Sequence, residues 1–159
     1  MPIKVGDRIP SSRLRVATPE GPAWKTTDEI FKGKKVALFA VPGAFTPTCS
    51  NQHLPSVVQN ADAIRAKGVD MVAMTSVNDH MVMGAWQKAS GAENVDFLSD
   101  GNGEFAKAID LTMDASGGGL GIRSKRYSML VEDGVVTQLN IEEPGKFDVS
   151  SGDTMLKQL

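Results

Sequence analysis

Two apolar runs of strand length constrain the fold of this chain more than any other feature. Residues 36–41 read VALFAV and stop at Pro42-Gly43, and residues 71–77 read MVAMTSV. Neither run alternates regularly between apolar and polar residues, so each predicts a strand that is buried on both faces. Such strands need a covering layer on both sides of their sheet. The chain is therefore predicted to fold as an α/β domain.

The segments around these runs have the patterns of helices and further strands. Over residues 48–67, apolar side chains recur at spacings of three and four, which predicts a helix that Gly68 ends. Asp133-Gly134 separates two strand-like segments and is a strong signal for a hairpin. Residues 1–33 are expected to form short strands and loops that end in a brief helix near 27–31. The other expected elements are a helix capped by Asn78 or Asp79 and reaching about 89, helices over 104–109 and from 152 onward, and strands over 95–99, 127–132 and 135–141. The prediction is a mixed central β-sheet with helices on both faces, which suits a thioredoxin-like fold and several other α/β folds.

Length and charge exclude several classes of protein. The 159 residues, 1–159, are expected to form one domain. A formal net charge of −2 without a basic cluster argues against nucleic acid or an anionic membrane as partner. No apolar stretch approaches the roughly 18–20 residues that cross a bilayer, and the first residues have no apolar signal core. With one cysteine, the chain has neither an internal disulfide nor a metal site of several thiolates, so a reducing, cytoplasmic location is expected.

That one cysteine, Cys49, lies between a predicted buried strand and a long predicted helix. It therefore falls in the first helical turn, at the carboxyl end of a strand, where α/β sheets usually place their sites. Amides without helical partners and the positive end of the helix dipole both stabilise a thiolate there. A buried cysteine that behaves as a small hydrophobe is the alternative. The polar neighbours Thr46, Thr48, Ser50 and Asn51 favour a reactive thiol.

The residues around Cys49 also match a known pattern. Pro42, Thr46 and Cys49 form P-x-x-x-T-x-x-C, within the longer string PGAFTPTCS. Further matches are His53, Pro55, the segment 76–79, Trp86 and the segment 121–128, which reads GIRSKRYS. In these motifs, and from about Val5 to Leu159, the chain resembles the peroxiredoxins, and within them the type II or Prx5-like subfamily. The resemblance implies a thioredoxin-like fold and a thiol peroxidase that reduces hydrogen peroxide and organic hydroperoxides.

The resemblance also implies roles for individual residues. Cys49 would be the nucleophile that attacks peroxide, and Thr46 would hydrogen-bond the thiolate and the peroxide through its hydroxyl. Pro42 would shield the sulfur from water. Arg126 would supply a permanent cation. Arg123 is a competing candidate three residues away, and Arg126 is preferred because it directly precedes Tyr127-Ser128, as in the family pattern.

His53 allows two interpretations. It follows Cys49 by four residues and so shares a helix face with it, which would suit the base of a Cys–His pair in a hydrolase or transferase. The alternative, which is preferred, is a histidine that packs and hydrogen-bonds behind the site. A non-enzymatic redox-sensing module is a third class of function for the chain. The glycines 117–119 and 121 lack a following Lys-Ser/Thr and so predict a turning loop rather than a phosphate loop.

The absence of a second cysteine determines how the cycle would be completed. Attack on peroxide leaves Cys49 as a sulfenic acid, and the chain has no cysteine to resolve it. An external thiol must therefore do so, and the resemblance favours glutathione with glutaredoxin over thioredoxin. No cofactor or metal is expected. The resemblance also implies a homodimer, with Phe45 and Trp86 as candidate contacts.

Overall fold

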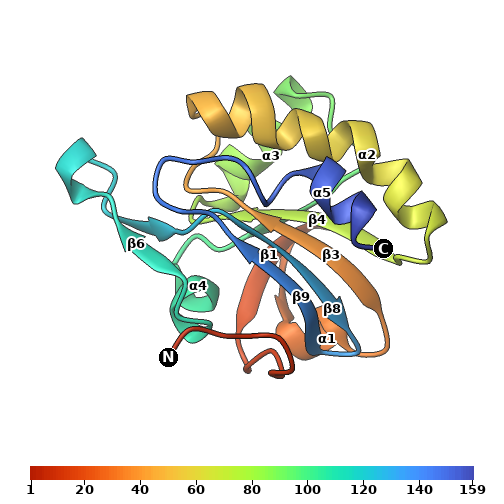
Figure 1. Cartoon of the computed structure of the whole chain (residues 1–159). Helices are drawn as coiled ribbons and strands as arrows, with labels where there is room; N and C mark the ends of the chain where they lie inside the picture. The colour runs from red at the N-terminus through yellow and green to blue at the C-terminus, as the bar shows by residue number, and fades with distance from the viewer.

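The two apolar runs form neighbouring parallel strands in the middle of one sheet. In the computed structural model, which describes all residues 1–159, the strands are ordered β2-β1-β5-β4-β3-β8-β9 (Figure 1). Their bounds are β1 Arg13–Thr18, β2 Gly21–Thr26, β3 Lys35–Ala40, β4 Met71–Ser76, β5 Asp96–Ser99, β8 Tyr127–Glu132 and β9 Val135–Ile141. Strand β3 is parallel to β4 and β4 is parallel to β5, whereas β8 pairs antiparallel with both β3 and β9. The sheet is therefore mixed, as predicted.

Helices cover both faces of this sheet, which confirms the predicted α/β architecture. Their bounds are α1 Thr27–Phe31, α2 Leu54–Ala66, α3 His80–Ala89, α4 Glu104–Ala108 and α5 Gly152–Lys157, and a π-helical turn, η1 Cys49–His53, precedes α2. In Figure 1, α2, α3 and α5 lie above the sheet and α1 and α4 lie below it. Asp79 caps α3 through a bond from the Val82 amide, one of the two cap positions expected.

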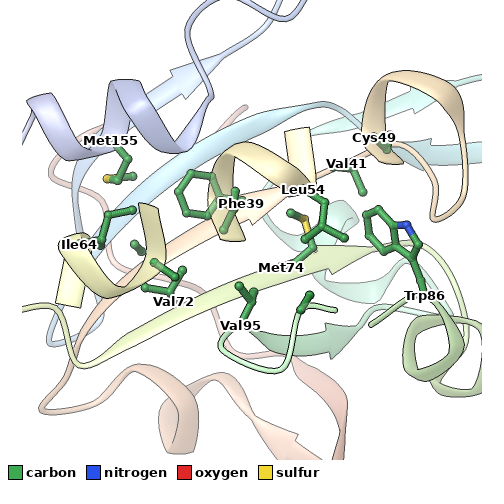
Figure 2. Packing of buried hydrophobic residues seen from close by; sticks show 14 of the residues in the cluster. Phe39, Val41, Cys49, Leu54, Ile64, Val72, Met74, Trp86, Val95 and Met155 are labelled. Carbon is green, nitrogen blue, oxygen red and sulfur yellow. The ribbon is translucent and has the colours of Figure 1, made fainter. Parts of the chain in front are cut away.

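The side chains of β3 alternate between two apolar cores. Ala37, Phe39 and Val41 point into the core under α2, α3 and α5, and the intervening Val36, Leu38 and Ala40 point into the opposite core. Figure 2 shows the first core, with Cys49 and Trp86 at one end and Met155 at the other. Burying each large apolar side chain contributes about 1.5–3 kcal/mol, so this strand is a rigid base for the loop that follows it.

A two-stranded ribbon outside the central sheet was not predicted. Strands β6 (Thr112–Asp114) and β7 (Ile122–Ser124) pair as a separate ribbon around a short 3₁₀ turn, η2 (Ser116–Gly118), and the ribbon projects from the body (Figure 1). Three-residue strands are too short to give a recognisable period. The glycine-rich loop expected here is the turn of this ribbon, with Gly119 and Gly121 at φ values of +78° and +70°.

Gly152, the first residue of α5, lies directly against the backbone of α2. A Cβ on Gly152 would lie 2.8 Å from the carbonyl carbon of Ser56, and neither backbone can move without disturbing its helix. We therefore expect Gly152→Ala to lower the free energy of unfolding by about 1–3 kcal/mol. Gly84, within α3, has no atom within 4 Å of the place that a Cβ would take, so Gly84→Ala should raise stability by up to about 1 kcal/mol. Urea unfolding of the two variants checks both signs, and a neutral Gly152→Ala would contradict the close approach.

Candidate active site

The loop between β3 and α2 is held in place by its neighbours. The Val41 amide donates to the Thr75 carbonyl at 3.1 Å, which extends the β3–β4 pairing by one bond. The Ala44 amide donates to Oδ1 of Asn78, in the loop after β4, at 2.9 Å. Phe45 has a φ of +64°, a left-handed conformation that costs energy outside glycine and turns the chain sharply into the helix. The loops at the carboxyl ends of two parallel strands are thus joined at this point.

The first turns of the helix are not regular. Pro47 and Thr48 are helical, and the Ser50 amide donates to the Thr46 carbonyl at 2.8 Å. The Leu54 amide then donates to the Cys49 carbonyl, five residues back, where an α-helix would use four. Pro55 has no amide hydrogen and its ring crowds the carbonyl of Asn51, so an α-helical bond cannot form there. A single π-helical turn is the local solution, in place of the continuous α-helix predicted.

Cys49 is fully buried, and one cation reaches its sulfur. Nη2 of Arg126 donates to Sγ of Cys49 at 3.1 Å. Arg126 lies just before β8, beside the end of β3, because Ala40 pairs with Tyr127. Cys49 is also in the first turn of its helix, where amides are not used by the helix itself. The sulfur therefore lies beside a permanent cation and in the first turn of a helix.

Arg123, the competing candidate, contacts main-chain oxygens instead. Its Nε donates to the Leu120 carbonyl at 2.8 Å, and its Nη1 lies 3.3 Å from the Val77 carbonyl and 3.5 Å from that of Pro42. It therefore supports the main chain of the loops that follow β3 and β4. Of the two arginines, only Arg126 is placed to act on the sulfur directly.

The hydroxyl of Thr46 has a different partner from the one expected. It donates its hydrogen to the Gly43 carbonyl at 2.7 Å, and no hydrogen bond joins it to Cys49. With its only hydrogen used, the Thr46 oxygen can act only as an acceptor toward another molecule. A neutral hydroperoxide carries a hydroxyl hydrogen and can donate to such an oxygen.

A cavity of about 260 Å³ opens beside the arginine. It is lined by Pro42, Thr48, Met113, Lys125, Arg126 and the segment 142–146. Arg126 and the partly buried Pro42 both line the cavity, and the Arg126 guanidinium also contacts the buried sulfur. Cys49 and Thr46 are not among the lining residues. A small polar molecule in the cavity would therefore lie next to the residue that holds the sulfur.

His53 lies behind the arginine and does not contact the sulfur. Its Nδ1 is 2.9 Å from Nη1 of Arg126, and its Nε2 is 2.8 Å from the Ser150 carbonyl. Burial, and then the charge of Arg126, lower the pKa of His53 to about 3. The ring is therefore neutral near pH 7, with its hydrogen on Nε2, because a carbonyl can only accept. This geometry favours the packing interpretation of His53 over that of a base for Cys49.

Two residues near His53 gave no recognisable signal in the sequence. Glu142, 6% exposed, accepts hydrogen bonds from the backbone of residues 148–150, and Ser150 supplies the carbonyl that holds His53. A glutamate directly after a strand usually lies in solvent, so the sequence gives no sign of a structural role for Glu142, and only the folded structure shows that it is buried.

Trp86, expected as a dimer contact, is fully buried, and its Nε1 donates to Oγ of Ser50 at 3.0 Å. It belongs to the core because α3 turns its apolar face toward the sheet. Phe45 is 53% exposed, and its ring centroid lies 6.5 Å from that of Trp86.

No helix has the length and apolarity that a membrane crossing requires, and no three His, Cys, Asp or Glu side chains are grouped as a metal site would need.

Comparison with known proteins gives consistent matches along the whole chain. Residues 4–156 match the family model described as Redoxin. The chain is 49% identical over 162 residues to the chloroplastic peroxiredoxin-2E of Arabidopsis thaliana, covering 99% of this chain and 69% of that protein. The structure of reduced Prx3 in complex with H2O2 from Vibrio vulnificus is 49% identical, with a TM-score of 0.96 and 98% of each chain covered. Peroxiredoxin 5 from Alvinella pompejana is 31% identical, with a TM-score of 0.85, covering 99% of this chain and 100% of that one.

The state of His53 predicts a pH-dependent part of the stability. Its pKa of about 3 in the fold lies below the unfolded value of about 6.5. The neutral ring therefore contributes its full stabilisation to the fold above about pH 6.5, and this contribution to the free energy of unfolding is lost as the pH falls toward 3. Between pH 7 and pH 4 we expect the free energy of unfolding of the wild-type protein to fall by about 3 kcal/mol relative to that of His53→Gln. Urea unfolding at both pH values measures this difference.

Comparison with the variant is needed because a second buried group acts in the opposite direction. Burial raises the pKa of Asp100 to about 6, so protonation of Asp100 increases the free energy of unfolding as the pH falls. That gain is common to both proteins and cancels in the difference. Parallel pH profiles for the two proteins would show that His53 titrates in the fold as it does in the unfolded chain.

Proposed function

The chain belongs to the peroxiredoxin family, whose members are thiol peroxidases, and we propose that it reduces hydroperoxides through a one-cysteine cycle at Cys49 with glutathione as the returning thiol. The fold is the thioredoxin-like fold that the resemblance implied. The observation that carries the proposal is the 3.1 Å contact between Nη2 of Arg126 and Sγ of Cys49 in a buried position. An ionised sulfur held by a permanent cation is the reactant that peroxide reduction needs.

The first half of the cycle is a displacement at oxygen. The Cys49 thiolate supplies an electron pair to the nearer oxygen of the hydroperoxide, so an S–O bond forms and the O–O bond breaks. The other oxygen leaves as hydroxide or alkoxide and takes a proton from water to give water or an alcohol. The sulfur is oxidised to the sulfenic acid, and the peroxide is reduced by two electrons.

Each neighbouring group has a distinct part in this step. Arg126 stabilises the thiolate and the negative charge that moves toward the leaving oxygen. The Thr46 oxygen accepts a hydrogen bond from the hydroperoxide hydroxyl, since its own hydrogen is held by Gly43. Pro42 keeps bulk water from the sulfur at the border of the cavity. The cavity, with Met113 and Pro144 in its wall, leaves room for the apolar part of an organic hydroperoxide as well as for hydrogen peroxide.

The second half returns the sulfur to the thiol. Glutathione attacks the sulfenic sulfur, a mixed disulfide forms and water leaves, after which glutaredoxin or a second glutathione removes the glutathionyl group. Two features support an anionic small thiol. Cys49 has no partner cysteine in the chain, and Lys125 lines the cavity, where it would meet a carboxylate of glutathione. Lys146 also lines the cavity, with its Nζ paired to Oε2 of Glu143 at 3.1 Å. Direct reduction by thioredoxin is the competing scheme.

The cycle as proposed uses no resident cofactor or metal, and it suits the reducing cytoplasm as an antioxidant activity. We also propose the homodimer that the resemblance implies. The exposed ring of Phe45 supports it as a contact, whereas the buried Trp86 would act only by packing behind Phe45.

Cys49→Ser should abolish peroxide reduction and leave the fold unchanged, because the substitution is nearly isosteric and removes only the nucleophile. Turnover with glutathione and glutaredoxin, together with circular dichroism, measures both properties. Peroxide turnover by Cys49→Ser at the wild-type rate would exclude Cys49 as the reacting group.

Arg126→Met should lower the second-order rate constant of Cys49 with hydrogen peroxide by about 100-fold or more, because it removes the cation that contacts the sulfur. Arg123→Met removes an equal charge three residues away and keeps that contact, so its effect should be clearly smaller. Stopped-flow fluorescence of Trp86, which packs against the helix of Cys49, follows the oxidation. The reverse order of the two variants would assign the cation to Arg123.

One equivalent of peroxide followed by glutathione should give a protein heavier by about 305 Da, the mass of one glutathione less two hydrogens, because the sulfenic acid condenses with a thiol. Added glutaredoxin should return the original mass. Intact mass spectrometry follows both steps. Steady turnover with thioredoxin alone, with no glutathionyl adduct, would overturn the glutathione scheme and leave the peroxidase assignment intact.

A further inference from the structure

Glu142 is a buried carboxylate that the reaction described above does not use. It lies just after β9, with its amide bonded to the Arg126 carbonyl at 3.0 Å, so its main chain is directly beside that of the arginine. Its Oε2 accepts four hydrogen bonds. The donors are the amides of Asp148, Val149 and Ser150, at 2.8, 2.8 and 2.9 Å, and the Ser150 hydroxyl at 2.7 Å. Three successive amides converging on one oxygen make a cradle for an anion, and the protein fills it with its own side chain.

The segment held by Glu142 ends at the carbonyl that orients His53. The Ser150 carbonyl accepts from Nε2 of His53 at 2.8 Å, which fixes the ring hydrogen on Nε2 and leaves the Nδ1 lone pair free. Nη1 of Arg126 donates to that lone pair at 2.9 Å, and Nη2 of the same guanidinium donates to the Cys49 sulfur at 3.1 Å. A continuous series of polar contacts therefore joins Glu142 to the reacting atom.

The same segment also packs against both members of the pair that it orients. The ring of Phe147 lies 4.9 Å from that of His53, and the Arg126 guanidinium carbon lies 5.9 Å from the Phe147 centroid. On the far side, the Gly152 amide donates to Oγ of Ser56 at 3.1 Å, and that hydroxyl donates to the His53 carbonyl at 2.7 Å. If the segment shifted, the histidine ring and the arginine would lose their supports together.

We propose that Glu142 is a positioning residue for peroxide reduction, holding residues 148–150 so that the Ser150 carbonyl orients His53 and His53 orients Arg126 against the Cys49 sulfur. The proposal rests on the peroxidase function of Cys49 described above. In this role Glu142 acts through other residues and does not contact the sulfur.

The charge on Glu142 fits this assignment. Burial raises the pKa of its carboxyl, but the hydrogen bonds from residues 148–150 together outweigh burial and leave the pKa below its usual value. The group is therefore a carboxylate near pH 7. An amide oxygen in its place would carry no charge and would hold four donors more weakly, because hydrogen bonds to ionised acceptors are about twice as strong as neutral ones.

The decisive variant is Glu142→Gln, which keeps the shape of the side chain and removes the charge. We expect the second-order rate constant for oxidation of Cys49 by hydrogen peroxide to fall about 10–100-fold, because small misplacements of a positioned group have effects of this size. Glu132→Gln removes the same charge from an exposed position at the far end of β8 and should leave the rate unchanged. Equal rates for the wild-type protein and Glu142→Gln would overturn the proposal.

A spectroscopic measurement separates positioning from a general loss of structure. The chain has two histidines, His53 and the partly exposed His80, so their ring nitrogens are assigned in a ¹⁵N spectrum by comparison with His53→Asn. In the wild-type protein, His53 should be held with its hydrogen on Nε2. In Glu142→Gln we expect a mixture of the two neutral forms, with the His80 signals unchanged. A slower variant in which His53 keeps the wild-type signals would show that Glu142 acts by another route, and would overturn the proposal.

A double-variant comparison tests the order of the contacts. His53→Asn keeps an acceptor near Arg126 and loses the donor to Ser150, which cuts the hydrogen-bonded connection to Glu142 and leaves only the weaker packing of Phe147 on Arg126. Adding Glu142→Gln to His53→Asn should therefore lower the rate by less than about twofold further, whereas independent effects would multiply and contradict the proposal.

If Glu142→Gln does not fold, Ser150→Ala is the replacement variant. It removes one of the four hydrogen bonds to Glu142 and should also lower the rate, by severalfold. If wild-type Cys49 itself reacts no faster than a free thiol, the proposed function fails first, and these comparisons distinguish the two failures.

Discussion

The contact of one guanidinium with two partners is the interaction on which the site depends. Arg126 donates to the Cys49 sulfur through Nη2 and to His53 through Nη1. An ion of either sign is costly to bury alone, and the cost falls when the two are paired and hydrogen-bonded. In the proposed reaction the Cys49 thiolate and the guanidinium stabilise each other, and the neutral His53 accepts a hydrogen bond from the same guanidinium.

The sheet brings these groups together from segments far apart in the chain. Strand β3 leads into the loop and turn that carry Cys49, and β8 runs antiparallel beside it, so that Ala40 pairs with Tyr127. Arg126, one residue earlier, then lies at the edge where the loop begins. A shift of one residue in this register would send the arginine to the other face of the sheet. The two apolar cores on either side of β3 oppose such a shift.

Local irregularity at the helix start completes the arrangement. Pro55 lacks the amide that a regular helix would use, and the chain responds with one π-helical turn from Cys49 to His53. Within this turn both side chains are buried and both contact the same guanidinium. The 142–152 segment then packs against His53 through Phe147 and the Ser150 carbonyl, so residues near the end of the chain also support the site.

The sequence by itself determined the elements of the central sheet, the position of Cys49 after a buried strand, and the family, because apolar periodicity, turn residues and a long motif are local properties. It did not reveal the β6–β7 ribbon, because three-residue strands are too short to show a period. It also did not reveal the π-helical turn, which forms where Pro55 lacks an amide hydrogen. Only the tertiary structure decided that Arg126 reaches the sulfur while Arg123 supports the loop, that the Thr46 hydrogen is held by Gly43, and that Glu142 is buried. These outcomes depend on strand register and on the burial of polar groups, and both are set by contacts between residues that are distant in the sequence.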